Sequence, residues 1–72
     1  MSIIIYGKDN CDNCNRIKNI LNSKNISFEY INDLKTLMIT ASKARIMSAP
    51  VIEYNNNFYS FNTFLEVIAN EY

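Results

Sequence analysis

The chain has 72 residues, of which 49% are apolar, and its seven Lys and Arg residues balance seven Asp and Glu residues. A chain of this length forms one domain, residues 1–72, with a modest core that its Phe and Tyr residues help to fill. A nucleic-acid-binding domain of this size would carry a basic excess, so the net charge of zero argues against nucleic acid as a partner.

Residues 2–6 are rich in β-branched side chains and predict a buried strand. This strand contains the longest apolar run of the chain, which is too short for a membrane span or an export signal, so we expect a cytoplasmic protein without membrane contact. Residues 7–10 predict a turn. A helix then begins near Cys11 or Asp12 and ends near Asn25, because apolar residues follow helical spacing on one face: Cys14, Ile17, Ile20 and Leu21.

Residues 28–30 alternate apolar and charged side chains and predict a second strand. Asn32 is a candidate N-cap for a second helix, and Asp33 is favourable in its first turn. An apolar stripe follows on this helix, formed by Leu34, Leu37, Met38 and Ala41. The Ala-Pro pair at 49–50 ends the helical stretch, because the residue before a proline is disfavoured in the α region.

Residues 51–54 predict a third strand, and the Asn run at 55–57 predicts a hairpin turn, so that residues 58–59 pair antiparallel with that strand. The final helix has the clearest helical period, formed by Phe61, Phe64, Leu65, Ile68 and Tyr72. The order β-α-β-α-β-β-α predicts an α/β fold with a right-handed crossover between the first two strands. We therefore expect a thioredoxin-like arrangement, in which a four-stranded mixed sheet is flanked by three helices.

Both cysteines of the chain lie in one C-x-x-C motif at the start of the first helix. Residues at this spacing share a face of the first turn, close enough to form a disulfide. The free N–H groups and the dipole of a helix start stabilise negative charge, which should lower the thiolate pKa of the exposed Cys11. Cys11 is then the attacking nucleophile, and the less exposed Cys14 resolves the mixed disulfide.

A zinc site is the main alternative use of a C-x-x-C motif. A closed mononuclear site needs four ligands, and two Cys with no His cannot supply them within one chain. We therefore expect no metal unless two chains share it. The strand–turn–helix placement of the motif favours redox chemistry.

Residues 6–14, Tyr-Gly-Lys-Asp-Asn-Cys-Asp-Asn-Cys, resemble the glutaredoxin active-site stretch, in which a strand and a lysine precede C-P-Y-C. Residues 48–51, Ser-Ala-Pro-Val, resemble the T-V-P segment of the same family, whose proline is cis and packs beside the active site. The likeness covers essentially the whole chain. It implies a thiol–disulfide oxidoreductase that reduces protein or glutathione mixed disulfides, with glutathione as its reductant and partner.

The resemblance also implies a glutathione site. Lys8 would bind the glycine carboxylate, the backbone of Ala49 before cis Pro50 would pair with the cysteinyl part, and the N–H groups at Asn62 and Thr63 would hold the γ-glutamyl carboxylate. Either of the last two residues could instead serve only as a helix cap.

The chain departs from the family pattern at two places. Asp12-Asn13 stands for Pro-Tyr between the cysteines, and Tyr59-Ser60 stands for Gly-Gly ahead of the last helix, where a Tyr side chain would narrow the groove. Small glutaredoxin-like proteins that donate electrons to ribonucleotide reductase, and are recharged by thioredoxin reductase, have similar short chains with a serine-containing turn here. Such an electron donor is the first alternative function.

Two further alternatives belong to other functional classes. In an iron–sulfur carrier, two chains would each provide Cys11 as a ligand to a cluster whose remaining ligands are glutathiones. Cys14 makes this function less favourable, because Cys11 can form a disulfide with it instead of binding a cluster. A non-catalytic interaction domain is disfavoured by the intact dithiol. The leading expectation remains a monomeric electron carrier whose partners are glutathione and disulfide-containing proteins, including ribonucleotide reductase under the first alternative.

Overall fold

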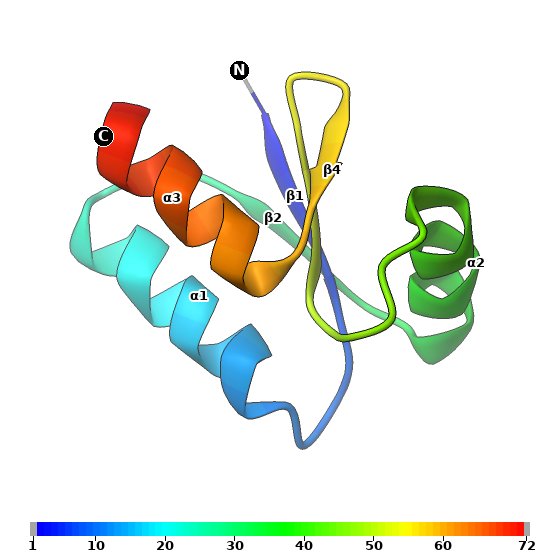
Figure 1. Cartoon of the computed structure of the whole chain (residues 1–72). Coiled ribbons are helices and arrows are strands. Elements are labelled where there is room, and N and C mark those ends of the chain that lie inside the picture. The colour runs from blue at the N-terminus through cyan, green and yellow to red at the C-terminus, as the bar shows by residue number, and fades with distance from the viewer. Residues whose placement is uncertain (1, 72) are drawn as a thin grey trace.

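The predicted order of strands and helices is the order of the folded chain (Figure 1). The structure is a computed structural model that describes residues 2–71, so the expected contribution of Tyr72 to the last helix lies outside the described residues. Its elements are β1 (Ile3–Gly7), α1 (Asp12–Ser23), β2 (Glu29–Asn32), α2 (Leu34–Ala44), β3 (Val51–Tyr54), β4 (Asn57–Tyr59) and α3 (Phe61–Glu71).

The four strands form one mixed sheet in the order β2-β1-β3-β4. β1 runs parallel to β2 and antiparallel to β3, and β3 and β4 form the expected antiparallel hairpin. In Figure 1, α1 and α3 lie on one side of the sheet and α2 lies alone on the other. The thioredoxin-like α/β prediction is thus confirmed. No helix in residues 2–71 is long and apolar enough to cross a membrane.

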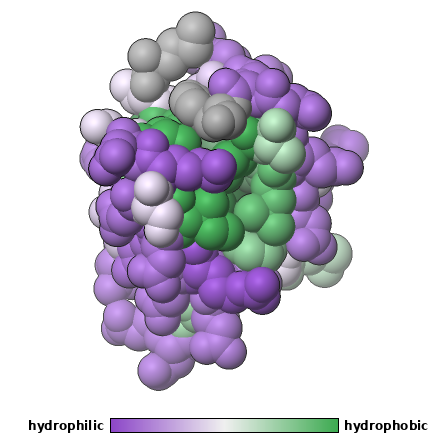
Figure 2. All heavy atoms as spheres, turned by 90° about the vertical axis from the view of Figure 1, so that its left-hand side faces the viewer, coloured by the Kyte–Doolittle hydropathy of each residue, from purple (hydrophilic) through white to green (hydrophobic). Residues whose placement is uncertain are grey.

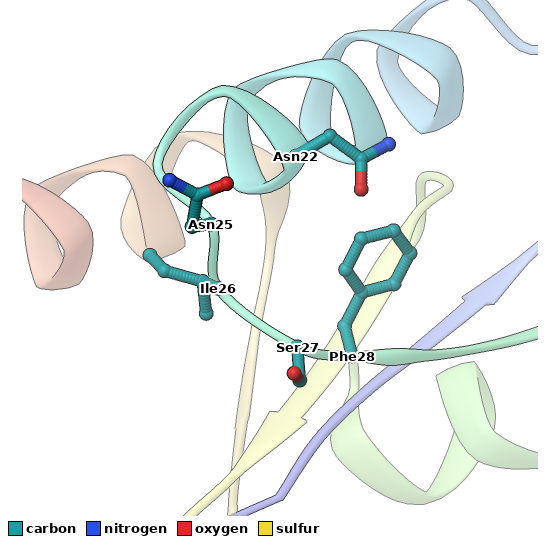
Figure 3. Close-up of a pocket in the computed structure, with 5 residues that line it drawn as sticks. All are labelled: Asn22, Asn25, Ile26, Ser27 and Phe28. Atoms are coloured by element: carbon teal, nitrogen blue, oxygen red, sulfur yellow. The ribbon is translucent and has the colours of Figure 1, made fainter.

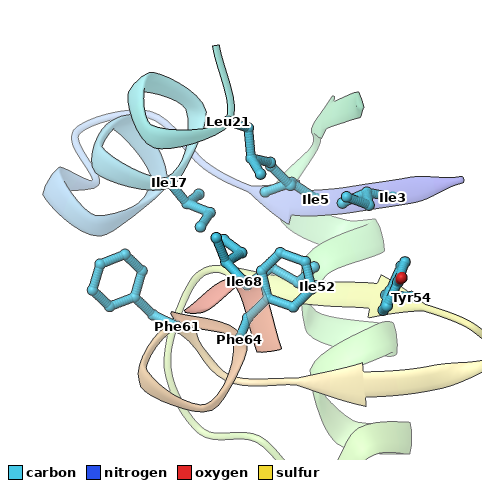
Figure 4. Packing of buried hydrophobic residues seen from close by; sticks show 9 residues of the cluster. All are labelled: Ile3, Ile5, Ile17, Leu21, Ile52, Tyr54, Phe61, Phe64 and Ile68. Atoms are coloured by element: carbon cyan, nitrogen blue, oxygen red, sulfur yellow. The ribbon is translucent and has the colours of Figure 1, made fainter. Parts of the chain in front are cut away.

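The main core lies between the sheet and the pair α1 and α3 (Figure 4). β1 alternates buried and half-buried residues, so its odd-numbered side chains enter this core. Burying each large aliphatic side chain contributes about 1.5–3 kcal/mol. The buried cluster consists of Ile3, Ile5, Ile17, Leu21, Ile52, Tyr54, Phe61, Phe64 and Ile68.

The two faces of the sheet are covered unequally. Figure 2 shows the α1 and α3 side, where hydrophilic atoms surround one strip of hydrophobic atoms. On the other side, α2 buries only Leu37 and Thr40. The predicted apolar stripe of α2 is therefore buried at Leu37 alone, whereas Leu34 and Met38 remain exposed.

The end of α1 and the start of α2 differ from the sequence-based expectation. α1 ends at Ser23 because Asn25 adopts a left-handed conformation (φ 58°), and the N–H of Ile26 then bonds to the carbonyl of Leu21 at 2.9 Å. The N-cap of α2 is Asp33, whose carboxylate accepts the Thr36 N–H at 3.1 Å. The prediction of Asn32 as the cap was wrong, because this residue still pairs with β1 as the last residue of β2.

α2 also ends before the position that the sequence predicted, which was the Ala-Pro pair at 49–50. Its last residue is Ala44, and Arg45 closes the helix in a left-handed conformation (φ 59°). The N–H of Ile46 bonds to the Ala41 carbonyl at 3.0 Å, which satisfies one of the last carbonyls of the helix. The residues that follow form a loop, so Pro50 precedes β3 instead of ending the helix.

The β3–β4 turn is shorter than predicted. Asn55 and Asn56 take positive φ values of 53° and 63°, as a two-residue hairpin turn of type I′ requires. Asn57 already pairs with Tyr54 and belongs to β4. Asparagine therefore supplies the left-handed conformations that glycine often provides elsewhere.

Gly7, at the end of β1, packs closely against the ring of Tyr30. A Cβ at this position would overlap the hydroxyl of Tyr30 and lie 2.7 Å from its Cζ. We expect Gly7→Ala to lower the free energy of unfolding by about 1–3 kcal/mol, the usual cost of overpacking. Urea denaturation would measure this, with the same substitution in a Tyr30→Ser background as the control. An equal loss of unfolding free energy in both backgrounds would show that the new Cβ does not clash with Tyr30.

The cap of α2 makes stability depend on pH. Hydrogen bonds from Thr36 hold the pKa of Asp33 below its ordinary value of about 3.9. A lowered folded-state pKa stabilises the fold above that ordinary value, and this contribution is lost as pH falls through the folded pKa. Asp33→Asn keeps a capping side chain without the charge, so its melting temperature should fall less than that of the parent between about pH 5 and about pH 2.

Glu66→Gln is the matched control, because Glu66 is exposed on α3 and has no hydrogen-bond partner in residues 2–71. Its melting profile should keep the acid dependence of the parent. If the melting temperature of Asp33→Asn instead depended on pH as that of the parent does, the hydrogen bond between Thr36 and Asp33 would not couple folding to protonation.

Candidate active site

The loop between β1 and α1 presents the two cysteines. β1 ends at Gly7, and Asn10 takes a left-handed conformation (φ 56°) that turns the chain into α1. The carboxylate of Asp9 accepts a hydrogen bond from the side-chain amide of Asn32 at 2.8 Å, which ties the loop to the end of β2. The motif therefore lies at the carboxyl end of two parallel strands.

Cys11 and Cys14 are joined by a disulfide, with their Cα atoms 5.2 Å apart. Cys11 is the N-cap of α1, and its Sγ accepts the backbone N–H of Cys14 at 3.1 Å. The side chain of Cys14 is fully buried, whereas Cys11 retains 9% of its surface exposed. Cys14 therefore lies deeper than Cys11, as expected, but Cys11 is itself almost buried and not exposed as the sequence predicted, because its side chain caps α1 and is joined to Cys14.

The helix start can stabilise a thiolate at Cys11. The N–H of Cys14 already points at Sγ, and the positive end of the helix dipole lies at the same place. A hydrogen bond to a charged acceptor contributes about 1.5–3 kcal/mol. Asp12, exposed in the first turn, partly opposes this field with its negative charge.

The Ala49–Pro50 peptide bond is cis, as the resemblance implied. Pro50 is fully buried, and the next residue, Val51, pairs with Tyr6 of β1. This register brings Ala49 and Pro50 beside the end of β1, where the dithiol loop begins. No other described residue forms a hydrogen bond with the backbone of residues 47–49, so this edge is available to a ligand.

Lys8 and Ala49 line one pocket of about 290 Å³. The structure thus brings together two residues that the sequence separates widely. The remaining walls come from α2 and the loop after it: Leu34, Leu37, Met38, Ala41, Ile46, Met47 and Ser48.

Asn62 and Thr63 are exposed in the first turn of α3 and do not line this pocket. The cap of α3 is provided by Ser60, whose Oγ accepts the Thr63 N–H at 3.4 Å. The hydroxyl groups of Ser60 and Thr63 also share a hydrogen bond of 2.8 Å. The Thr63 N–H, which the resemblance assigned to the γ-glutamyl carboxylate, therefore already donates a hydrogen bond to Ser60.

Tyr59 does not narrow a groove in the way the sequence suggested. Its ring packs against the core and lies 5.7 Å from the ring of Phe64, centroid to centroid. The strand alternation of β4 explains this, because it directs the side chain toward α3. The Tyr59 side chain thus contributes to packing.

Arg16 is a residue near the site that the sequence interpretation missed. Its guanidinium lies 5.5 Å from the ring centroid of Phe61, the first residue of α3. This contact joins α1, just after Cys14, to the start of α3. Only the folded structure reveals it, because the two residues are far apart in the sequence.

A larger hollow of about 410 Å³ lies at the other end of α1 (Figure 3). Its lining contains no cysteine and no charged residue: Asn22, Asn25, Ile26, Ser27 and Phe28. It offers nothing to redox chemistry. Across residues 2–71, no three His, Cys, Asp or Glu side chains are grouped to hold a metal ion.

Comparisons with known proteins agree with this geometry. The chain is similar to the solved structure of NrdH-redoxin from Escherichia coli, a glutaredoxin-like protein described as having a thioredoxin-like activity profile. The two share 24% sequence identity with a TM-score of 0.75, over 100% of this chain and 96% of the other. A comparison with curated proteins gave no match.

The sequence profile of the glutaredoxin family matches residues 3–59. This match covers most of the chain and includes the dithiol, Lys8 and the cis-proline segment, but it ends before α3. The redox-active cysteine pair, the sheet order and the profile lead to one conclusion: the chain belongs to the glutaredoxin family of thiol–disulfide oxidoreductases.

Proposed function

We propose that this chain reduces disulfide bonds of other proteins, with Cys11 as the nucleophile and Cys14 as the resolving thiol. The observation that carries this proposal is the hydrogen bond from the Cys14 N–H to the Cys11 sulfur at the start of α1. It stabilises negative charge on the sulfur of Cys11, the less deeply buried of the two residues. The buried Cys14 is shielded from external disulfides and acts only after Cys11 has reacted.

The reaction proceeds in two exchanges. The Cys11 thiolate attacks one substrate sulfur, forming a mixed disulfide and releasing the other substrate sulfur as a thiolate, which takes up a proton. Cys14, as its thiolate, then attacks the Cys11 sulfur and releases the second substrate thiol. Two electrons have passed to the substrate, and the chain is left with the Cys11–Cys14 disulfide seen in the structure.

Glutathione is the first candidate reductant. Its support is the pocket that joins the Lys8 cation to the unpaired backbone edge at Ala49. These groups suit one carboxylate and the central peptide of glutathione. The γ-glutamyl carboxylate has fewer free donors, because the Thr63 N–H already donates a hydrogen bond to Ser60. We therefore expect glutathione to work with reduced affinity.

Recharging by thioredoxin reductase is the second candidate, and delivery of electrons to ribonucleotide reductase would accompany it. The capped start of α3 favours this route, since it weakens one anchor for glutathione. The similar fold of NrdH-redoxin, with its thioredoxin-like activity profile, is consistent with it. A comparison of glutathione plus its reductase with NADPH plus thioredoxin reductase would separate the two routes.

The two cysteines should respond differently to substitution. Cys11→Ser removes the nucleophile and should reduce disulfide exchange to the uncatalysed background. Cys14→Ser should abolish dithiol reduction of protein disulfides yet retain exchange with glutathione mixed disulfides and accumulate a mixed disulfide at Cys11. Turnover assays and intact-mass spectrometry would measure these effects. Full activity in Cys11→Ser would refute the assignment of the nucleophile.

Replacing the α3 cap should improve the use of glutathione. Ser60→Gly frees the Thr63 N–H while keeping a tolerated capping residue, at a cost of only a few tenths of a kcal/mol. A new hydrogen bond to the γ-glutamyl carboxylate would lower the KM for glutathione by up to about tenfold. Ser27→Gly, on an exposed loop beside the hollow at the far end of α1, is the control. An unchanged KM in Ser60→Gly would show that the α3 start does not bind this carboxylate.

A further inference from the structure

Lys8 lines two pockets of the molecule. The first is the pocket of about 290 Å³ that it shares with Ala49. The second has a volume of about 270 Å³, and Leu34 lines both, so the two pockets adjoin at Lys8 and Leu34. The other walls of the second pocket come from the loop before Cys11, the end of β2 and the cap of α2: Asp9, Asn32 and Asp33. The cation that the resemblance assigns to a ligand carboxylate therefore lies beside two acidic residues.

Hydrogen bonds hold both carboxylates of the second pocket in place. Asp9 accepts the side-chain amide of Asn32 at 2.8 Å, and Asp33 accepts the Thr36 N–H at 3.1 Å. The bonds from Thr36 lower the pKa of Asp33, so its carboxylate is ionised at neutral pH. Within residues 2–71, no ion pair joins Lys8 to either carboxylate. A ligand at Lys8 therefore meets three separate charges.

The charge around Lys8 is negative, although the whole chain has a net charge of zero. Asp9 and Asp33 outnumber the single cation, and the lysines of α2, Lys35 and Lys43, line neither pocket. A pocket of this volume keeps the charges on its walls within about one Debye length of each other, which is about 10 Å at about 0.1 M salt. The two carboxylates therefore reduce the attraction of Lys8 for an anion.

We propose that Asp9 and Asp33 determine specificity by opposing Lys8, so that disulfides which bring a carboxylate to Lys8 react more slowly than neutral or cationic ones. The inference rests on the proposed reduction of disulfides and adds the charge class of the substrate. A mixed disulfide of glutathione brings such a carboxylate, whereas a protein disulfide flanked by neutral or basic side chains does not. Like charges that are brought together weaken binding and slow the encounter. The two carboxylates thus select protein disulfides of the second kind.

Three small disulfides of similar size isolate the effect of charge. Cystamine is cationic, hydroxyethyl disulfide is neutral and dithiodipropionate is anionic. The chain is reduced with dithiothreitol, freed of it and mixed with each disulfide, and formation of the Cys11–Cys14 disulfide is followed by acid quenching and mass spectrometry. The readout is the ratio of the rate with cystamine to the rate with dithiodipropionate. A substitution that only changes the reactivity of the Cys11 thiolate alters all three rates similarly and leaves this ratio unchanged.

Asp33→Asn keeps a capping side chain, and Asp9→Asn keeps an acceptor for the Asn32 amide, so each removes a charge without removing the acceptor oxygen. Each should lower the ratio about fivefold at low salt, and Lys8→Gln should raise it by a similar factor. In about 1 M salt these effects should fall below about twofold. Glu66→Gln, the control, removes the same charge from α3, which lies across the sheet from α2 (Figure 1), and should change the ratio less than about 1.5-fold.

A ratio that stays at the parent value in both aspartate variants, or that changes as much in Glu66→Gln, would overturn the proposal. Lys8→Gln tests the same opposition from the side of the cation, so an unchanged ratio in this variant would overturn it as well, even if an aspartate variant did not fold. In each of these cases, reduction of hydroxyethyl disulfide by the parent would still support the proposed function. A parent that reacts with hydroxyethyl disulfide no faster than free cysteine does would instead count against the proposed function.

Discussion

The bond from the Cys14 N–H to the Cys11 sulfur is the interaction on which the site depends. A helix start leaves backbone N–H groups without partners, and Ser, Thr, Asp or Asn usually accepts from them. Here a cysteine occupies the cap, so the group that satisfies the helix start is also one sulfur of the redox-active pair. The same helix buries Cys14, Ile17 and Leu21 along one face, and this face sets how deeply Cys14 is buried.

The register of the sheet positions the cis-proline segment of the site. Because Tyr6 pairs with Val51, the cis-proline segment must lie beside the end of β1, whatever the path of the chain between them. The core under α1 and α3 holds this register, since a shift by one residue would turn Ile52 and Tyr54 away from it. Lys8 and Ala49 therefore meet in one pocket through strand pairing and not through local sequence.

The sequence predicted those features that local patterns determine. The β-branched run of β1, the Asn-rich hairpin and the C-x-x-C at a helix start each carry a short-range signal. Asn32 and Asp33 are both good capping residues, so only the pairing of Asn32 with β1 decided between them. The end of α2 carried no signal, because Arg45 adopts a conformation usually left to glycine or asparagine. The direction of the Tyr59 ring and the contact of Arg16 with Phe61 depend on tertiary packing.

The two faces of the sheet are covered unequally, and this leaves apolar side chains of α2 exposed. Most of its core lies under α1 and α3, so α2 is free to leave methionine and leucine in solvent. At the start of α3, Ser60 satisfies an N–H that could otherwise hold a carboxylate of a small ligand. A hydrogen bond to a charged group contributes about 1.5–3 kcal/mol, and burying one methionine side chain contributes a similar amount. Under the proposed function, a ligand that cannot use the N–H groups at the start of α3 can therefore regain a similar free energy by covering an exposed methionine such as Met38.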